Sequence, residues 1–248
     1  MIFHVCWAAG KMLTLALESS TTRASVALFE GAKLIGELQS DIQRSHSEFM
    51  NSAILTLLNS RGMDPAKISL IATTPGPGSF TGVRVASSLA KTMAYSLNVP
   101  IWSIDSLSAL ASCSNLAPNP QKFVAINAFK NMVYYSAFSG ENKLVGPSVI
   151  EINRVGEIMD NLFVMGQIQF YGDAYELCRA VLRENLRDRL LSPSHSTMIF
   201  PSASQIGTLS NRSPDLGTTL DWNLFQPLYL RASEAEENLR LRGVEKLK

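Results

Sequence analysis

The residues whose types and spacing could do chemistry gather around one glycine-rich turn, Pro75-Gly76-Pro77-Gly78-Ser79-Phe80-Thr81-Gly82-Val83-Arg84. An apolar run from Ile68 to Thr74 precedes it, and the pattern after it predicts a helix from Thr81 to Leu97 with Thr81 as N-cap. Glycines here permit a tight turn, so we expect outward-facing amides at a helix N-terminus, which favours anions. The candidate contacts for an anion or nucleotide are Gly76, Gly78, Ser79, Thr81, Gly82 and Arg84.

The same turn lacks the features of the known phosphate-binding loops. It contains neither GxxxxGK[ST] with its phosphate-binding lysine nor the dinucleotide pattern GxGxxG. A strand-to-helix turn that only presents the following helix explains the residues as well as an anion site does.

Other reactive side chains are scattered through the chain. Glu18 could organise magnesium at the end of a first strand, but an ordinary turn acid explains it equally well. His4, His46 and His195 are the only histidines and are far apart, which is unlike the paired histidines of a helical metal site. Ser79 has no neighbouring histidine or acid to activate it. We therefore predict no catalytic residue and no metal ligand.

Composition limits the class of protein. Only 17% of the 248 residues are charged, below the roughly 25% of ordinary soluble domains, so surface may need covering by a partner. A net charge of +1 argues against a protein that holds nucleic acid by itself. Three distant cysteines without a CxxC pair favour a reducing cytoplasm. Residues 1–11 lack the basic start of a signal peptide and are expected to be a flexible extension.

The order of elements predicts an α/β fold with two mixed-sheet half-domains flanked by helices. Three short strands (Met12–Leu17, Ala24–Phe29, Lys33–Leu38) should form an antiparallel start, followed by a helix from His46 to Ser60, which is the order of actin-like and ribonuclease H-like folds. In the second half, we expect a strand over Phe163–Tyr171 and a helix over Ala174–Leu190. The predicted units are 1–11, 12–104, 105–231 with its last segment able to pack back on the first unit, and a charged tail at 232–248.

The two first-half helices carry unusual surfaces. The helix over Thr81–Leu97 has a second face of small and apolar residues and few charges, which indicates burial on both sides. Either the second half covers this face or a protein partner does. The predicted partner or dimer interface comprises His46, Phe49, Met50, Leu55, Val85, Ser88, Leu89, Thr92 and Ser96. Pairing of two copies through these helices would hide the surface, so we expect a homodimer when the chain is alone.

These features together resemble the TsaB family, also called YeaZ. The resemblance rests on Gly76 to Arg84, the strand and turn at Leu15 to Thr22, the His46-Ser47 helix start and Pro227-Leu228-Tyr229-Leu230-Arg231. It extends from Met12 to about Arg231 and is strongest up to Ala111.

The resemblance implies an actin-like fold and a non-catalytic partner of TsaD. TsaD transfers threonylcarbamoyl onto the adenosine 3′ to the anticodon of ANN-reading tRNAs, and the ATPase TsaE joins the assembly. The implied partners are thus a TsaD-like and a TsaE-like subunit, with tRNA held indirectly and ATP with Mg²⁺ bound only within the complex. The alternative is a weak nucleotide-binding hydrolase or a peptidase of the same superfamily.

Overall fold

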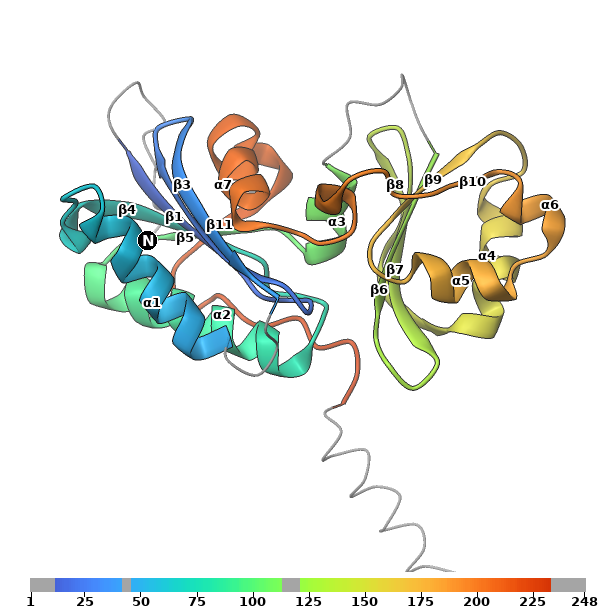
Figure 1. The fold of residues 1–248 in the computed structure, drawn as a ribbon, viewed down its shortest axis with the longest axis horizontal. Coiled ribbons are helices and arrows are strands. Elements are labelled where there is room, and N and C mark those ends of the chain that lie inside the picture. Colours follow the sequence, from blue (N-terminus) through green and yellow to red (C-terminus); the bar gives the residue numbers. More distant parts are fainter. Residues whose placement is uncertain (1–11, 42–45, 113–120, 233–248) are drawn as a thin grey trace, which may run out of the picture.

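Two β-sheets lie side by side, and helices cover both (Figure 1). The computed structural model describes residues 12–41, 46–112 and 121–232. The expectations for residues 1–11, for the tail beyond residue 232 and for His4, Cys6 and Cys113 lie outside the described residues.

The first sheet has six strands in the order β11-β5-β4-β1-β2-β3. Its first three strands pair antiparallel, which confirms the predicted start. β4 and β5 then run parallel to β1, and β11 closes the far edge antiparallel to β5. The bounds are β1 (Leu13–Glu18), β2 (Ala24–Glu30), β3 (Lys33–Ser40), β4 (Ile68–Thr73), β5 (Ile101–Ser103) and β11 (Thr218–Leu220).

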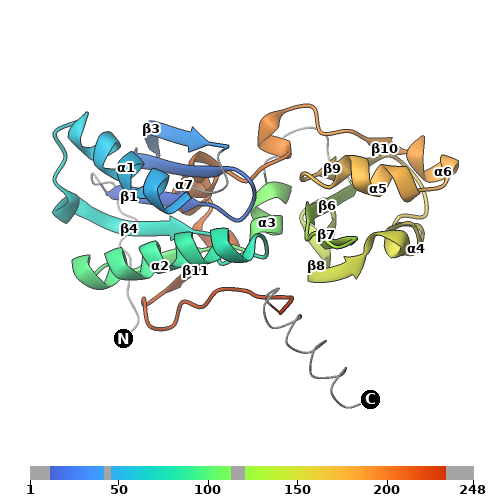
Figure 2. The same ribbon diagram turned by 60° about the horizontal axis from the view of Figure 1, so that its bottom comes forward.

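Strand alternation gives this sheet two buried faces. Leu15 and Leu17 point to the face covered by α1 (His46–Asn59) and α2 (Phe80–Leu97), whereas Ala16 points to the face covered by α7 (Ala203–Arg212). Figure 2 shows α1 and α2 on one side of the strands and α7 on the other. On the α7 side, Ala16, Ala27 and Ala72 alternate with the larger Phe29, Leu70 and Trp102 in one buried cluster.

The second sheet has five strands in the order β10-β9-β6-β7-β8. Helices α4 to α6 pack on its outer face, and α3 lies against its inner face, between the two sheets (Figure 1). The bounds are α3 (Ser106–Ala111), β6 (Gln121–Asn127), β7 (Met132–Ser139), β8 (Asn142–Glu151), α4 (Val155–Leu162), β9 (Ile168–Tyr171), α5 (Tyr175–Val181), α6 (Glu184–Arg187) and β10 (Leu190–Leu191). Short 3₁₀ turns occupy Pro65–Lys67, Ile152–Arg154, Ser196–Met198 and Pro214–Leu216.

After β11 the chain runs along α2 toward the second sheet, and we call residues 221–232 the C-terminal strap (Figure 2). Phe225 is buried in the first core, and its carbonyl accepts a bond of 3.0 Å from Nζ of Lys91. The amide of Leu228 donates to the carbonyl of Pro75 at 2.7 Å. Arg231 then donates to the carbonyl of Ala128 in the β6–β7 loop at 2.6 Å. The strap thus ties the glycine turn and α2 to the second sheet.

Some predicted elements of the second half are wrong. The expected helix over Ala174–Leu190 is two short helices, because the backbone is extended at Leu182 and Arg183 and both Leu182 and Leu186 reach the core. The expected strand from Phe163 begins only at Ile168. Among the described residues, no helix has the length and apolar character needed to cross a membrane.

Candidate interaction groove and interdomain cleft

The helix after the glycine turn is capped two residues earlier than predicted. Ser79 is the N-cap of α2, because its Oγ accepts a bond of 3.3 Å from the amide of Gly82. Thr81 lies inside the first turn and is exposed, so its prediction as N-cap is wrong. An N-cap side chain accepts from a backbone amide two or three residues later in the chain, as Ser79 does from Gly82. Thr81 is only one residue before Gly82, so its side chain cannot cap that amide.

The turn packs tightly against the turn between β1 and β2. The amide of Ser79 donates to the carbonyl of Ser20 at 2.7 Å, so the expectation of outward-facing amides is wrong at this residue. A Cβ at Gly78 would lie 2.0 Å from the carbonyl oxygen of Ser20, and a Cβ at Gly82 would lie 1.9 Å from that of Ser19. Close backbone packing therefore explains Gly78 and Gly82 without any ligand.

Of the remaining residues of the turn, Gly76 is buried, whereas Arg84 is exposed on α2. Gly76 has φ of +106°, and its carbonyl accepts from the amide of Ser106 at 2.9 Å. The guanidinium of Arg84 lies 4.6 Å from the centre of the Phe80 ring, a cation–π contact. That ring packs on Tyr229 of the C-terminal strap at 4.9 Å. Phe80 thus lies between two hollows of the surface, and Arg84 lines one of them.

Glu18 is sealed at the end of β1. Its side chain is fully buried, one carboxyl oxygen accepts from the amide of Ser20 at 2.6 Å, and the other accepts from the hydroxyl of Thr74. Burial raises the pKa of the Glu18 carboxyl above its ordinary value of 4.5, although the bonds from Ser20 and Thr74 oppose the shift. A carboxyl held this way stabilises two neighbouring turns and does not face open space.

Replacing Glu18 by glutamine should increase stability at neutral pH relative to the parent protein. Because the folded-state pKa of Glu18 is raised, its contribution to stability is complete below pH 4.5 and is lost as the pH rises from 4.5 through the folded-state pKa. Glutamine has no proton to lose, so within this window the difference in unfolding free energy should grow by about 1.4 kcal/mol per pH unit. Urea unfolding of both proteins at several pH values measures it, and a pH-independent difference would contradict the assignment.

The deep end of the cleft between the two sheets is nearly closed. A pocket of about 20 Å³ remains between the β1–β2 turn, Ser79 and the β6–β7 loop, enough for one water molecule. Asp173 borders it and accepts from the amide of Asn127 at 2.8 Å, and burial raises the pKa of its carboxyl. Burial also raises the pKa of the nearby Cys178 thiol to about 12, so this thiol is unreactive.

This geometry does not fit the ATP and Mg²⁺ that an actin-like fold implies. The carboxyl of Glu18, at the end of the first strand, already accepts hydrogen bonds from Ser20 and Thr74. The glycine turn lies against Ser20, where a phosphate would need space. Among the described residues, no three histidine, cysteine or acidic side chains are grouped as metal ligands would be.

A groove of about 560 Å³ opens between α1 and α2, and we call it the α1–α2 groove. Four of the predicted interface residues line it: Val85, Ser88, Leu89 and Thr92. Arg84, which was predicted as part of the glycine turn, lines it as well. Ser47 and Asn51 of α1 and Phe80 and Thr81 of α2 complete it.

The other predicted interface residues are not together. Met50 is fully buried and His46 is 5% exposed with Nε2 3.2 Å from the carbonyl of Thr22, so neither can present a contact surface and both predictions are wrong. Phe49 is half-buried, and Leu55 and Ser96 are exposed but do not line the groove. Met50 lies on the face of α1 that packs in the first core, together with Ala53, Ile54 and Leu57.

Sequence reasoning missed several residues. Ser47 and Asn51 are four apart, so helical spacing alone could have placed them on one face. A second hollow, between α2 and the β6–β7 loop, includes Lys130, Tyr134 and Arg231. Lys130 and Tyr134 are close in the sequence, but nothing in the sequence order brings Arg231 to them.

Comparisons with known proteins lead to proteins of tRNA threonylcarbamoyladenosine synthesis. A family model described as "TsaD: tRNA N6-adenosine threonylcarbamoyltransferase" matches residues 37–239. The chain is 33% identical over 147 residues to the tRNA threonylcarbamoyladenosine biosynthesis protein TsaB of Bacillus subtilis, covering 57% of this chain and 62% of that protein. It is 29% identical over 200 residues to the protein of the same name from Buchnera aphidicola subsp. Schizaphis graminum, covering 78% of this chain and 90% of that one.

Solved structures agree with the fold. The structure of YeaZ from Pseudomonas aeruginosa has a TM-score of 0.74 at 22% identity and covers 88% of this chain and all of that one, 100%. The likeness and the two helix-flanked mixed sheets confirm the predicted α/β, actin-like and ribonuclease H-like fold.

Proposed function

The chain belongs to the TsaD family and within it to the TsaB (YeaZ) group, and from this premise we propose that it is a non-catalytic scaffold subunit. It binds a TsaD-like enzyme and holds that enzyme in its working form for threonylcarbamoylation of the adenosine 3′ to the anticodon in ANN-decoding tRNAs. The relatives from Bacillus subtilis and Buchnera aphidicola are named as tRNA threonylcarbamoyladenosine biosynthesis proteins, which supports this role.

The observation that carries the proposal is the α1–α2 groove. Half-buried Val85 and Leu89 form its apolar floor, and exposed Ser88 and Thr92 are small enough to let another helix approach closely. The groove carries one charged side chain, Arg84, among its lining residues. Low charge and small side chains suit a packed helix–helix contact with a related subunit, since two copies of one fold present similar helices.

The geometry around the glycine turn supports a scaffold over an enzyme. Ser79 is engaged in capping α2, and Glu18 is enclosed by Ser20 and Thr74. Neither residue is therefore free to act as the activated nucleophile of a peptidase or as the magnesium-binding acid of a nucleotide hydrolase. In the proposed assembly ATP and Mg²⁺ act only within the complex, together with a TsaE-like ATPase, in the cytoplasm.

The same groove should make the isolated protein a homodimer, because a second copy can cover it. Size-exclusion chromatography with light scattering of the chain alone, and then of its mixture with the TsaD-like protein of the same genome, tests both statements. We expect a dimer that gives way to a stable one-to-one complex. A chain that stays dimeric or monomeric beside an excess of folded partner would contradict the scaffold role.

A further inference from the structure

Arg84 is the one charged side chain among the described residues that line the α1–α2 groove. It is exposed on α2, and its neighbours in the groove are apolar or uncharged polar residues. Covering an unpaired guanidinium in a packed helix–helix contact is costly, because the charge loses water and gains no opposite charge. A partner that packs over the groove therefore either supplies an acceptor to Arg84 or binds weakly.

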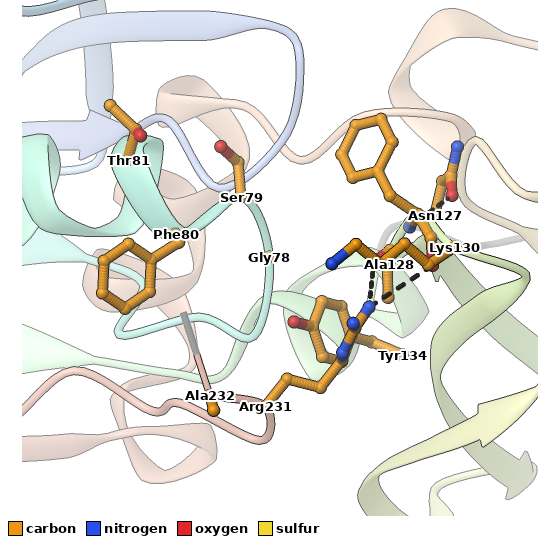
Figure 3. A pocket seen from close by; sticks show the side chains of 11 residues that line it. Gly78, Ser79, Phe80, Thr81, Asn127, Ala128, Lys130, Tyr134, Arg231 and Ala232 are labelled. Carbon is orange, nitrogen blue, oxygen red and sulfur yellow. Dashed lines mark hydrogen bonds between the residues drawn. The ribbon is translucent and has the colours of Figure 1, made fainter. Parts of the chain in front are cut away.

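An aromatic stack holds the guanidinium of Arg84. The guanidinium lies 4.6 Å from the centre of the Phe80 ring, and that ring packs on Tyr229 of the C-terminal strap at 4.9 Å. In Figure 3 the Phe80 ring points away from Lys130 of the β6–β7 loop. The three side chains thus form one stack that runs from the groove to the strap. A side chain that is already ordered loses little conformational freedom when a partner binds it.

The stack leaves the hydrogen-bonding edge of Arg84 available. A cation–π contact uses the flat face of the guanidinium, whereas its N–H groups point outward in the plane. Within residues 12–41, 46–112 and 121–232, Arg84 has the Phe80 ring as its partner and forms no ion pair. The planar arrangement of N–H groups matches the two oxygens of a carboxylate. The group that completes this site is therefore an aspartate or glutamate side chain of the partner.

A second copy of this chain brings no such carboxylate from its own groove. None of the described residues that line the groove is acidic. Glu48 is the one acidic residue of α1 and α2, and it does not line the groove. Pairing of two copies groove to groove would thus place two arginines in the contact without carboxylates opposite them.

We propose that Arg84 selects the partner: it forms an ion pair with a carboxylate of the TsaD-like subunit and disfavours pairing of the chain with itself. This inference rests on the proposed function and deepens it, because it names the chemistry that the partner presents at the groove. One charge then acts with opposite sign on two assemblies, and specific interfaces commonly combine attraction and repulsion in this way. The homodimer gives way to the complex for this reason, although both use one groove.

The test measures two dissociation constants for each variant. Sedimentation equilibrium gives the constant of the homodimer. Isothermal titration calorimetry with the TsaD-like protein of the same genome gives that of the complex, with homodimer dissociation taken into account. Arg84→Met keeps an extended side chain without the charge, and Arg84→Lys keeps the charge without the planar fork. Arg179→Met, at an exposed position of α5 in the second half, is the matched control.

The two constants should move in opposite directions. Arg84→Met should weaken the complex at least about 30-fold, because the partner's carboxylate is left unpaired, and should tighten the homodimer about tenfold. Arg84→Lys should leave the homodimer as in the parent and weaken the complex about fivefold. Arg179→Met should change neither constant. Because Arg84 and Arg179 are both exposed, all three variants should keep the parent's thermal midpoint.

Tyr229 should affect the complex only through Arg84, as a positioning residue. Tyr229→Leu removes the ring that supports Phe80, so the complex should weaken about threefold when Arg84 is present. The same change should have no further effect in the Arg84→Met background. Equal losses in the two backgrounds would contradict the role of the stack.

Two results would overturn the selection by Arg84 while the scaffold role stands. Parental affinity of Arg84→Met for the partner would show that the complex has no carboxylate at this position. A homodimer that is weakened by Arg84→Met would mean that a second copy supplies the carboxylate. Glu48→Gln, which should otherwise leave the homodimer unchanged, would then weaken it in the same way.

The chain's own C-terminal residues are tested separately. Residues 233–248 include Glu234, Glu236, Glu237 and Glu245, and a chain that ends at Ala232 lacks them. This shortened chain should bind the partner as the parent does, and tighter binding would assign Arg84 to the chain's own carboxylates. If the parent forms no complex at all, the scaffold role fails, and the homodimer constants alone then decide whether Arg84 opposes self-association.

Discussion

The complex with a TsaD-like partner is expected to be lost when Ser88 of α2 is replaced by arginine. Ser88 is exposed and lines the α1–α2 groove, so the parent fold can accept a long side chain there. In a packed helix–helix contact the arginine would be both too large and an unpaired buried charge. We expect the dissociation constant of the complex to rise more than about 100-fold, which is about 2.8 kcal/mol.

Three comparisons make this result interpretable. Leu89→Arg should also abolish the complex, although Leu89 packs partly on the first core and some loss of stability is expected. Asn161→Arg, at an exposed position of α4 in the second half, should leave complex formation unchanged. The homodimer of the isolated chain should dissociate with Ser88→Arg as well. A Ser88→Arg protein that still co-purifies with the partner would remove the groove from the interface.

The second large effect concerns the glycine turn. Gly82→Ala should destabilise the protein severely, because the new Cβ would lie 1.9 Å from the carbonyl oxygen of Ser19. The same change would disturb the bond of 2.8 Å from the Ser19 hydroxyl to the carbonyl of Gly82. The backbone of β1 is central in the sheet and cannot move away cheaply, so we expect a loss of about 3 to 5 kcal/mol. In a chain of this size that lowers the thermal midpoint by about 10 °C.

Gly146→Ala in β8 is the matched control, because a Cβ there meets nothing within 4 Å. Its thermal midpoint should stay within a few degrees of the parent, since such a change alters stability by about 1 kcal/mol or less. Equal midpoints for the Gly82 and Gly146 variants would contradict the packing argument. Gly78 is as crowded as Gly82, so a Gly78→Val protein should also be unfolded. Loss of nucleotide binding in that variant would therefore not identify a nucleotide site.

Much of the first half was predictable because its signals are local. Alternating apolar residues and a tight polar turn specify β1 to β3, and helical spacing specifies α1 and α2 within a residue or two at most ends. The second half was less predictable. The break at Leu182 and the two-residue strand β10 depend on packing against the second core, which leaves no periodic signal in so short a segment.

The candidate site divides in the same way. Val85, Ser88, Leu89 and Thr92 share one face of a single helix, so their spacing alone placed them together. The predictions for Met50 and His46 were wrong because the sequence shows that a helix is amphipathic but does not show where the edge of its buried face lies. The burial of each side chain depends on how α1 packs against β2 and β3.

By itself the sequence determined the glycine turn, the small-residue face of α2 and the order of elements, because each is encoded by neighbouring residues. Only the tertiary structure decided that Gly78 and Gly82 serve packing against Ser19 and Ser20, and that Glu18 is enclosed. It alone also brought Arg231 to the carbonyl of Ala128, 103 residues away in the chain, and so formed the second hollow, between α2 and the β6–β7 loop. Contacts between such distant segments arise from burial and chain topology, and no local pattern records them.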